Sequence, residues 1–368
     1  MRKDQQSIDI GFGRRELIAA AGCSALLATS PAAARTAQQT NVVATLALLV
    51  EREYPDVATA RELAVMLRAN LRTGKYRSLR REQLAHRLTA DMRELARDKH
   101  LKVEFDPHDA KLRTPALPRP VTTPYETPKT PSPNARAVFG PQGYGIIKAE
   151  LLEGNIGVLQ VDTFAPLYDL LRARIASAMD ILSDSYALIL DLRKNGGGTS
   201  DSPAYLPSYF FDRDPFVLNR LVWRNLPPEV IQTTRDIIGR TYGERRPLIV
   251  ATSGSTFSAA EAVAYSLQST KRATIVGQRT RGGANPGDYF SIGDGFVAFC
   301  PQGRAIDGVT GGNWEGTGVI PDVAAEPAVI LNIAHRVAAT QALAQATEPD
   351  AIDLLRNAIA SGPYPAGV

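Results

Sequence analysis

The stretch "RPLIVATSGSTFSAAEAVAYSLQ", residues 246–268, joins a buried strand to a helix through a turn rich in hydroxyl groups. The apolar run at 247–251 predicts the strand, and the alanine-rich end favours helix. Ser258 stands at the junction, where unpaired N–H groups of a helix start can stabilise a developing oxyanion. Ser258 and Glu261 also form the S-x-x-E capping box. The pattern leaves two roles open for Ser258, a nucleophile and a helix cap.

Around this unit, strand patterns alternate with helix patterns along the chain. Buried or alternating apolar runs at 144–152, 155–164 and 186–193 predict strands. Apolar residues at helical spacing predict helices at 166–183 and 326–346. This alternation favours a mainly α/β domain over residues 142–345, followed by a C-terminal tail at 346–368.

The region before this domain has a different character. Apolar residues recur at helical spacing within residues 41–106 and predict a small N-terminal domain of three amphipathic helices. Residues 107–141 hold nine prolines, a density that we expect to exclude regular helix. They are therefore predicted to form a proline-rich connection, partly extended.

Residues 1–34 have the features of a twin-arginine-type signal peptide. The pair Arg14-Arg15 precedes an apolar run at 17–28, and the alanines at 32–34 offer an A-x-A cleavage site. We expect export to a bacterial periplasm or secretion, with no stable membrane span after signal removal. Two alternatives are lipidation of Cys23 and an uncleaved tethering helix. After cleavage Cys300 is the one cysteine left, so no internal disulfide is expected, and its alternating surroundings predict a strand residue that fills a core.

The composition limits the classes of partner. Of 368 residues, 44% are hydrophobic and 22% charged, which is ordinary for a globular protein, and the net charge is only +4. The basic residues are scattered, so nucleic-acid binding is not expected. The four histidines are scattered too, and no metal or other cofactor is predicted. The oligomeric state cannot be inferred.

A second glycine-rich loop follows the strand predicted at 186–193. It contains Asn195 and then Gly196, Gly197 and Gly198. Consecutive glycines permit positive φ and leave backbone amides accessible to a ligand. The loop is a candidate oxyanion hole, with a simple tight turn as the alternative. It lacks the spacing of a phosphate-binding loop.

A serine nucleophile needs a base, and His100 is the best placed of the histidines. It lies where the helical domain gives way to a short alternating strand, "HLKVEF". His86 and His335 fall within predicted helices, and His108 lies in the proline-rich connection. Glu315, in the loop "GGNWEGTGV", is a candidate for the carboxylate that orients such a base. A solvated loop acid is the alternative for Glu315.

The long aromatic segment at 199–246 interrupts the strand–helix alternation. Such insertions form lids or substrate walls in some proteins and an extra packing layer in others. If the insertion forms a lid or substrate wall, we expect Phe211 and Trp223 to contact the substrate.

Four motifs, in this order, resemble one peptidase family. They are "D-x-H-L-x-V" from Asp98, "D-L-R-x-N-G-G-G" from Asp191, "T-x-S-A-A-E" from Thr256 and "W-E-G-x-G-V-x-P-D" from Trp314. The family comprises C-terminal processing (tail-specific) peptidases, tricorn core proteases and interphotoreceptor retinoid-binding protein modules. The resemblance spans about residues 41–340 and implies a ClpP/crotonase-like spiral of ββα units behind a helical domain.

The resemblance also implies catalytic roles. One branch of the family uses a lysine base from a "T-x-G-K" turn, but Gly283 stands at that position here, and the neighbouring Arg281 stays protonated. The histidine-using branch implies Ser258 as nucleophile, His100 as general base and Glu315 as the orienting residue. It also implies an oxyanion hole from the amides of Gly197 or Gly198 and Ala259. Lys99 departs from the serine that precedes the histidine in tricorn proteins.

The sequence thus predicts an exported serine peptidase of Ser/His/Glu type that acts on peptides or unfolded proteins. The competing hypothesis is a catalytically silent module on the same fold that binds a hydrophobic ligand or peptide. Aromatic residues of the 199–246 insertion would suit that second function.

Overall fold

The structure is a computed structural model that describes residues 31–115, 129–199, 201–212 and 215–363. Residues 1–30, which carry most of the predicted signal peptide, lie outside this range. Among the described residues, none of the helices is long and apolar enough to span a membrane.

Helices and strands alternate as the apolar periodicity predicts, and the mixed α/β class is confirmed. The helices are α1 Pro31–Glu53, α2 Val57–Arg72, α3 Arg81–Ala96, α4 Pro107–Leu112, α5 Pro133–Phe139, α6 Asp169–Leu182, α7 Ser202–Tyr205, α8 Ala259–Ser269, α9 Ile330–Leu343 and α10 Pro349–Ser361. The strands are β1 Lys102–Phe105, β2 Thr114–Pro115, β3 Ile146–Leu152, β4 Ile156–Val161, β5 Ala187–Asp191, β6 Val217–Trp223, β7 Glu229–Gln232, β8 Leu248–Thr252, β9 Thr274–Gly277, β10 Gly287–Gly293, β11 Phe296–Pro301, β12 Gly303–Asp307 and β13 Val323–Ala324.

The main body is a six-stranded sheet in the order β13-β9-β8-β5-β4-β3. β4, β5, β8, β9 and β13 run parallel, and β3 adds an antiparallel edge. Each parallel step returns through a crossover: α6 connects β4 to β5, α8 connects β8 to β9, and the longer segment from β5 to β8 includes α7. Because parallel strands end at the same edge, the loops after β5 and β8 emerge side by side, and these loops carry Asn195 and Ser258.

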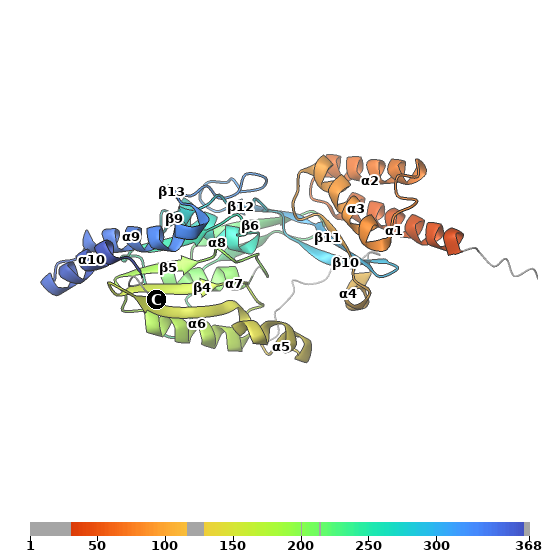
Figure 1. The fold of residues 1–368 in the computed structure, drawn as a ribbon. Coiled ribbons are helices and arrows are strands. Elements are labelled where there is room, and N and C mark those ends of the chain that lie inside the picture. The colour runs from red at the N-terminus through yellow and green to blue at the C-terminus, as the bar shows by residue number, and fades with distance from the viewer. Residues whose placement is uncertain (1–30, 116–128, 200, 213–214, 364–368) are drawn as a thin grey trace, which may run out of the picture.

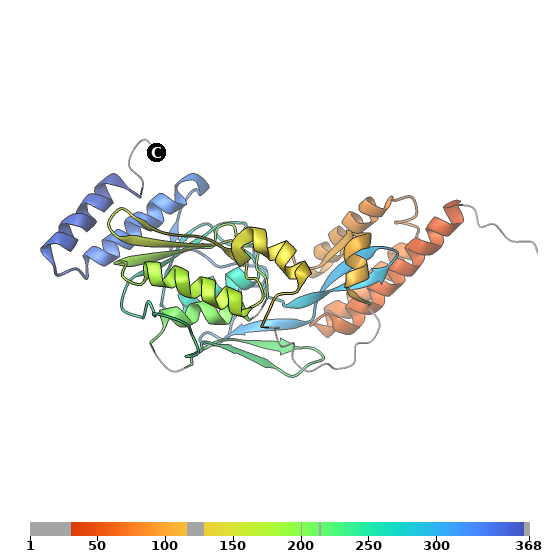
Figure 2. The same ribbon diagram turned by 90° about the horizontal axis from the view of Figure 1, so that it is seen from below.

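Helices cover both faces of this sheet, as Figures 1 and 2 show. The two faces alternate residue by residue along β5, where Leu188 and Leu190 pack towards α6 and α8. Ala187 and Ile189 point the other way and pack with α9 and α10. This alternation explains why the strand is apolar without interruption: both of its faces are buried.

The N-terminal helices α1, α2 and α3 pack against strands from later in the chain. They share one apolar core with β1 and with the hairpin β10–β11, which comes from late in the sequence. Figure 1 shows the hairpin reaching from the sheet body towards α1 and α3. Cys300 is fully buried on β11, as its alternating surroundings predict. The hairpin therefore connects two bodies, the N-terminal body of α1, α2, α3 and β1 and the main body around the six-stranded sheet.

Two segments differ from their expected structure. Within the proline-rich connection, α4 and α5 each begin with a proline at the first turn, where the missing N–H is not needed. The C-terminal tail is also partly helical, since α10 packs Leu355 and Ala358 into the core beneath α9. The expectation that the connection excludes regular helix was wrong at α4 and α5.

The aromatic insertion is mostly a packing layer. Its strands β6 and β7 form a small sheet with β12, and Tyr209 and Phe210 are fully buried in the main core. Phe211 is 5% exposed and stacks on Phe216 at 5.6 Å between ring centroids. Trp223 is partly exposed at the end of β6. Of the two residues predicted to contact substrate, Trp223 is therefore the more accessible.

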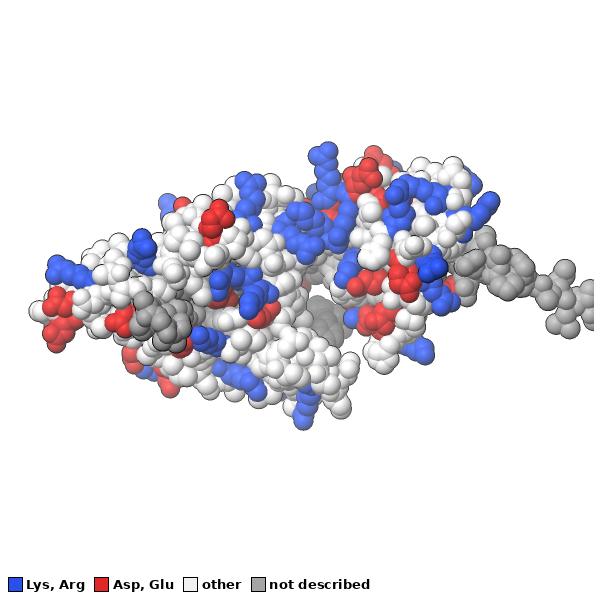
Figure 3. All heavy atoms as spheres, in the orientation of Figure 1, with Lys and Arg blue, Asp and Glu red and all other residues white. Residues whose placement is uncertain are grey.

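Charged side chains of both signs are interspersed over the face in Figure 3, although basic side chains gather where the two bodies meet. This distribution agrees with the small net charge of +4. On this face we find no continuous basic surface among the described residues.

Candidate active site

Ser258 lies in a strained turn between β8 and α8. Its backbone has φ 54° and ψ −119°, an unfavourable conformation for a residue with a side chain. Such strain costs on the order of 1–3 kcal/mol and persists only where surrounding contacts impose it. Backbone strain of this kind is typical of serines held at the tip of a strand-to-helix turn.

The turn is fastened to the loop after β5. The Phe257 amide donates to the Asn195 carbonyl at 3.0 Å, and the Thr256 hydroxyl donates to the Leu192 carbonyl at 2.8 Å. A Cβ added to Gly197 would lie 2.8 Å from the Ser258 Cβ and 3.2 Å from the Ala259 nitrogen. Only glycine therefore allows the two loops to approach this closely.

The amides near this junction differ in whether they already have an acceptor. The Gly197 amide is engaged, because it donates to the Asn195 side chain at 2.8 Å. The amides of Gly198 and Ala259 have no acceptor among the described residues, and Ala259 is the first residue of α8. Of the three residues predicted for an oxyanion hole, Gly198 and Ala259 thus have amides available.

Glu261 joins the Ser258 turn to the loop at residues 280–283. Its carboxylate accepts from the amides of Ser258 at 2.9 Å and Gly283 at 2.8 Å. It also accepts from the Gly282 amide at 2.6 Å and the Thr280 hydroxyl at 2.5 Å. The Ser258 hydroxyl completes the capping box only loosely, with no cap hydrogen bond of normal geometry within the described chain. Burial raises the pKa of Glu261 against these four donors.

We expect Glu261→Gln to lower the free energy of unfolding by about 2–4 kcal/mol. The amide keeps one acceptor oxygen but turns an N–H group towards backbone donors, so buried donors lose their partner. Urea denaturation of the variant measures this loss. The matched control is Glu82→Gln on the exposed face of α3, which should change little. A change below about 0.5 kcal/mol for Glu261→Gln would show that this carboxylate does not hold the turn.

His100 lies against the same loop. A Cβ added to Gly283 would be 2.5 Å from His100 Cε1 and 2.3 Å from the Phe257 ring. The His100 ring packs on Phe257 at 4.4 Å and on Phe299 at 5.6 Å between centroids. There is consequently no room for a side chain at position 283, where the lysine-using branch would place its base. His100 occupies that space.

The side chain of His100 is 6% exposed, and neither ring nitrogen has a hydrogen-bond partner among the residues that the structure describes. Burial lowers the pKa of His100 to about 4, with opposing attraction from Asp98 and further lowering by Arg281. The imidazole is therefore neutral at pH 7, as a general base must be. A hydrogen bond between His100 and Ser258 is not formed in this conformation.

Two acids lie beside His100. Asp98 Oδ1 is 3.7 Å from His100 Nδ1 and accepts the His100 backbone amide at 2.8 Å. Tyr54 and Asn285 donate to the other oxygen of Asp98, at 3.2 and 2.9 Å. Glu315 accepts from the Ala284 amide at 2.6 Å and leaves Oε1 without a partner in the described chain. Burial, followed by the charge of Asp98, raises the pKa of Glu315 to about 7.

The fold thus brings the predicted residues Ser258, His100 and Glu315 to one junction between the two bodies. The sequence motifs gave no role to Asp98, although it begins one of them. They gave Glu261 only its place in the capping box with Ser258. Lys99 donates to the Arg281 carbonyl and lies outside this cluster.

Comparison with known proteins agrees with this architecture. Residues 155–325 match the model of peptidase family S41, and residues 25–138 match the "N-terminal domain of Peptidase_S41 in eukaryotic IRBP". Together the two matched ranges span more than half of the chain. The chain belongs to peptidase family S41.

Relatives of this S41 chain include processing proteases. It is 28% identical over 185 residues to the carboxy-terminal-processing protease of Bartonella bacilliformis, covering 48% of this chain and 40% of that protein. It is 25% identical over 138 residues to the carboxy-terminal processing protease CtpA of Bacillus subtilis, covering 37% and 28%. The S41 chain therefore aligns with less than half the length of these relatives.

Solved structures share the fold of the S41 chain. The S499A mutant of CPAF superposes with a TM-score of 0.51 at 14% identity, covering 80% of this chain and 94% of that one. A lipoprotein from Streptococcus agalactiae superposes with a TM-score of 0.50 at 16% identity, covering 79% and 93%. These likenesses concern the fold alone.

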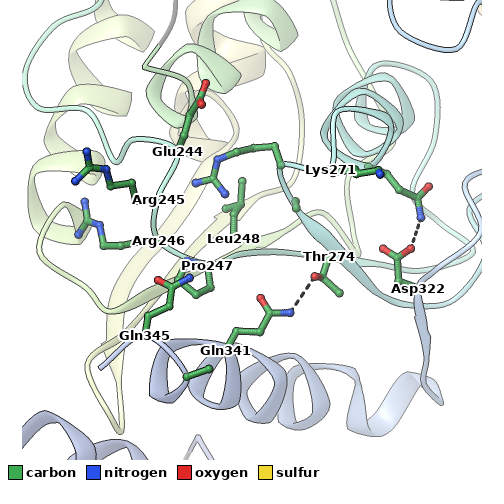
Figure 4. A pocket seen from close by; sticks show the side chains of 14 residues that line it. Glu244, Arg245, Arg246, Pro247, Leu248, Lys271, Thr274, Asp322, Gln341 and Gln345 are labelled. Atoms are coloured by element: carbon green, nitrogen blue, oxygen red, sulfur yellow. Dashed lines mark hydrogen bonds between the residues drawn. The ribbon is translucent and has the colours of Figure 1, made fainter. Parts of the chain in front are cut away.

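A separate pocket of about 600 Å³ lies at the opposite end of β8, where Leu248 starts the strand (Figure 4). Polar side chains on its wall pair with each other, Gln341 with Thr274 at 3.0 Å and Gln268 with Asp322 at 2.9 Å. The guanidinium of Arg272 donates to the Phe210 and Gly243 carbonyls. We assign this pocket no part in the chemistry at Ser258.

Proposed function

We propose that this S41 chain is an exported serine peptidase that hydrolyses peptides or unfolded proteins through an acyl-enzyme on Ser258. The observation that carries the proposal is the strained Ser258 turn, linked through Glu261 and Gly283 to the buried His100. A strained serine at a helix start, next to a neutral histidine, is suited to acyl transfer.

In the proposed reaction, Ser258 Oγ attacks the substrate carbonyl while His100 takes the hydroxyl proton. The amides of Gly198 and Ala259 donate to the oxygen that becomes negative. The tetrahedral intermediate then collapses, and the peptide C–N bond breaks as His100 returns the proton to the leaving amine. Water attacks the acyl-enzyme by the same route and releases the second product.

The reaction requires His100 to move towards Ser258. Its two ring nitrogens are unpaired in the described conformation, so no hydrogen bond has to be broken first. Catalytic hydrogen bonds are often long before substrate binds and shorten in the complex. We propose that substrate binding between the two bodies draws the His100 ring and the Ser258 turn together, with Glu315 and Asp98 stabilising the imidazolium that forms.

The experiment that tests this function is cleavage of an unfolded, fluorescently quenched protein by the purified protein. Release of fluorescence that stops with a serine-directed fluorophosphonate supports the proposal. If folded protein neither cleaves nor reacts with the probe, the silent binding module becomes the better account. The family model named for IRBP at residues 25–138 is the observation that favours that second function. The burial of Tyr209, Phe210 and Phe211 weighs against it, since these rings do not line an open pocket.

The proposal predicts a pH dependence set by Glu315. Its pKa of about 7 means that the stabilising carboxylate forms only as the pH rises through neutrality. We expect kcat/KM to increase with pH around an inflection near this value, with no separate inflection from His100, whose pKa lies near 4. Asp98→Asn should lower the inflection because it removes the neighbouring charge.

The same raised pKa has the opposite effect on stability. The folded protein holds the Glu315 proton more tightly than the unfolded chain, whose value is near 4.5. The contribution of Glu315 to the free energy of unfolding is therefore full below that value and is lost as the pH rises through about 7.

The control for the predicted pH dependence of activity is Glu315→Gln. If its kcat/KM profile kept the wild-type inflection, a group other than Glu315 would be the one that titrates.

A further inference from the structure

Asp98, His100 and Glu315 form a cluster with the composition of a metal site. One donor atom from each, two carboxylate oxygens and an imidazole nitrogen, lie within 4.8 Å of one another. The residues come from distant parts of the chain, Asp98 and His100 before β1 and Glu315 between β12 and β13. The scattered positions of the histidines predicted no ligand cluster. The fold, however, places two acids around one of these histidines, His100.

Several potential metal-ligand atoms in this cluster lack a hydrogen-bond partner. Both ring nitrogens of His100 and Oε1 of Glu315 are buried without a hydrogen bond among the described residues. His100 is more than nine-tenths buried, and its side chain is 6% exposed. A buried polar atom left unpaired costs about 1–3 kcal/mol. A ligand that accepts these lone pairs would therefore be bound favourably.

The charges of the cluster favour a cation. Two carboxylates share one buried site, and the remaining contacts of Asp98 are donors from Tyr54 and Asn285 that hold it in place. Arg281 and Arg93 are opposing charges near His100, and the Arg281 guanidinium lies over the Phe257 ring, 4.8 Å from its centroid. A divalent ion bound between the two carboxylates would neutralise both of them.

We propose that Asp98, His100 and Glu315 bind one divalent transition-metal ion of the Zn²⁺ type, and that the bound ion inhibits the peptidase by occupying the nitrogen of His100. One nitrogen and two carboxylate oxygens, completed by water, are a normal Zn²⁺ ligand set. Ligand atoms of a tetrahedral site lie about 3.4 Å apart, so the cluster has to contract slightly on binding. The inhibitory half of this proposal rests on the proposed function, whereas the binding half does not.

Binding is tested with ZnCl₂ alone, titrated against a chromophoric chelator. Ser258→Ala is the protein used, because it keeps all three ligands and carries no peptidase activity under the proposed mechanism. We expect one equivalent bound per chain, and at least about tenfold weaker affinity in both Asp98→Asn and Glu315→Gln. Cobalt(II) in place of zinc should give the intense visible absorption of a tetrahedral site.

Two controls keep the test decisive. His108→Ala, an exposed histidine on α4, should bind zinc as the parent protein does. Circular dichroism and urea denaturation identify a ligand variant that is unfolded, and the second ligand variant then carries the comparison. Zinc binding that is unchanged in folded Asp98→Asn and Glu315→Gln, or absent from the parent protein, overturns the proposal.

Inhibition is tested on wild-type protein by adding ZnCl₂ and then reversing it with EDTA. Loss of cleavage and of fluorophosphonate labelling at stoichiometric zinc supports the proposal, and uninhibited cleavage with the site filled overturns it. If wild-type protein never cleaves or labels, the proposed function has failed. The chelator titration then still decides the binding half by itself.

Discussion

Replacing Ser258 with alanine should abolish cleavage of an unfolded protein substrate, with kcat reduced by roughly 10⁴-fold or more. The hydroxyl is the only group that the proposed mechanism uses to form the acyl-enzyme. The variant should also stop reacting with a fluorophosphonate. Because alanine is a poorer fit than glycine but no worse than serine at φ 54°, the turn should keep its conformation. The free energy of unfolding is expected to change by less than about 1 kcal/mol.

The matched control is Ser255→Ala, three residues earlier in the same turn and exposed. It should cleave and label at wild-type rates. If Ser258→Ala retained cleavage while remaining folded, the serine would be a helix cap and the nucleophile would lie elsewhere. If the variant unfolded, the capping role would dominate the phenotype, and labelling of wild-type protein would have to decide.

His100→Phe should be as inactive as Ser258→Ala and still fold. Phenylalanine can keep the ring contacts with Phe257 and Phe299 but has no nitrogen to take a proton. Neither ring nitrogen of His100 has a partner among the described residues, so few hydrogen bonds are lost. The larger ring costs some packing energy, which we expect to stay below about 3 kcal/mol. Cleavage rates and urea denaturation together separate activity from stability.

A double variant, Ser258→Ala with His100→Phe, should be no slower than either single variant. Groups that act as a unit in one step are strongly non-additive. His86→Ala, at an exposed position on α3, is the control and should be fully active. Losses that multiply in the double variant would mean that the two residues act independently, against the proposed pair.

Much of the fold could be predicted from local patterns. The uninterrupted apolar run of β5 and the alternation of strands with helices determine a sheet covered on both faces, and the structure has it. Long-range pairing carries no such local signal. The hairpin β10–β11 joins the N-terminal core through contacts between residues nearly 200 positions apart, such as Lys102 with Phe299. Periodicity cannot place one strand beside the other.

The number of prolines in a segment does not by itself predict its structure, because the effect of a proline depends on its position in the helix. The nine prolines of residues 107–141 suggested an irregular segment, yet Pro107 and Pro133 start short helices. Proline is unfavourable inside a helix and favourable in its first turn. The high proline content therefore correctly predicted interruptions of regular structure, but it did not exclude short helices that begin with a proline.

For the candidate site, the sequence motifs named residues that the fold brings to one junction, but the motifs could not predict the contacts between those residues. The spacing of Asp98 and His100, two residues apart, does not show that their side chains meet. In the structure the Asp98 carboxylate accepts the His100 backbone amide and lies 3.7 Å from the Nδ1 atom of the ring. Likewise Gly197 and Gly198 are equivalent in sequence. The structure distinguishes them by the hydrogen bond from the Gly197 amide to Asn195 and by the atoms that surround each glycine.

The central claim is that Ser258 is a nucleophile, and it is tested most directly by locating a fluorophosphonate adduct. The folded wild-type protein is labelled, digested and analysed by mass spectrometry. The account predicts one adduct per chain, on the peptide that contains Ser258, and its absence when His100 is replaced by phenylalanine. An adduct on a different residue, or no adduct on protein that is demonstrably folded, would contradict the account.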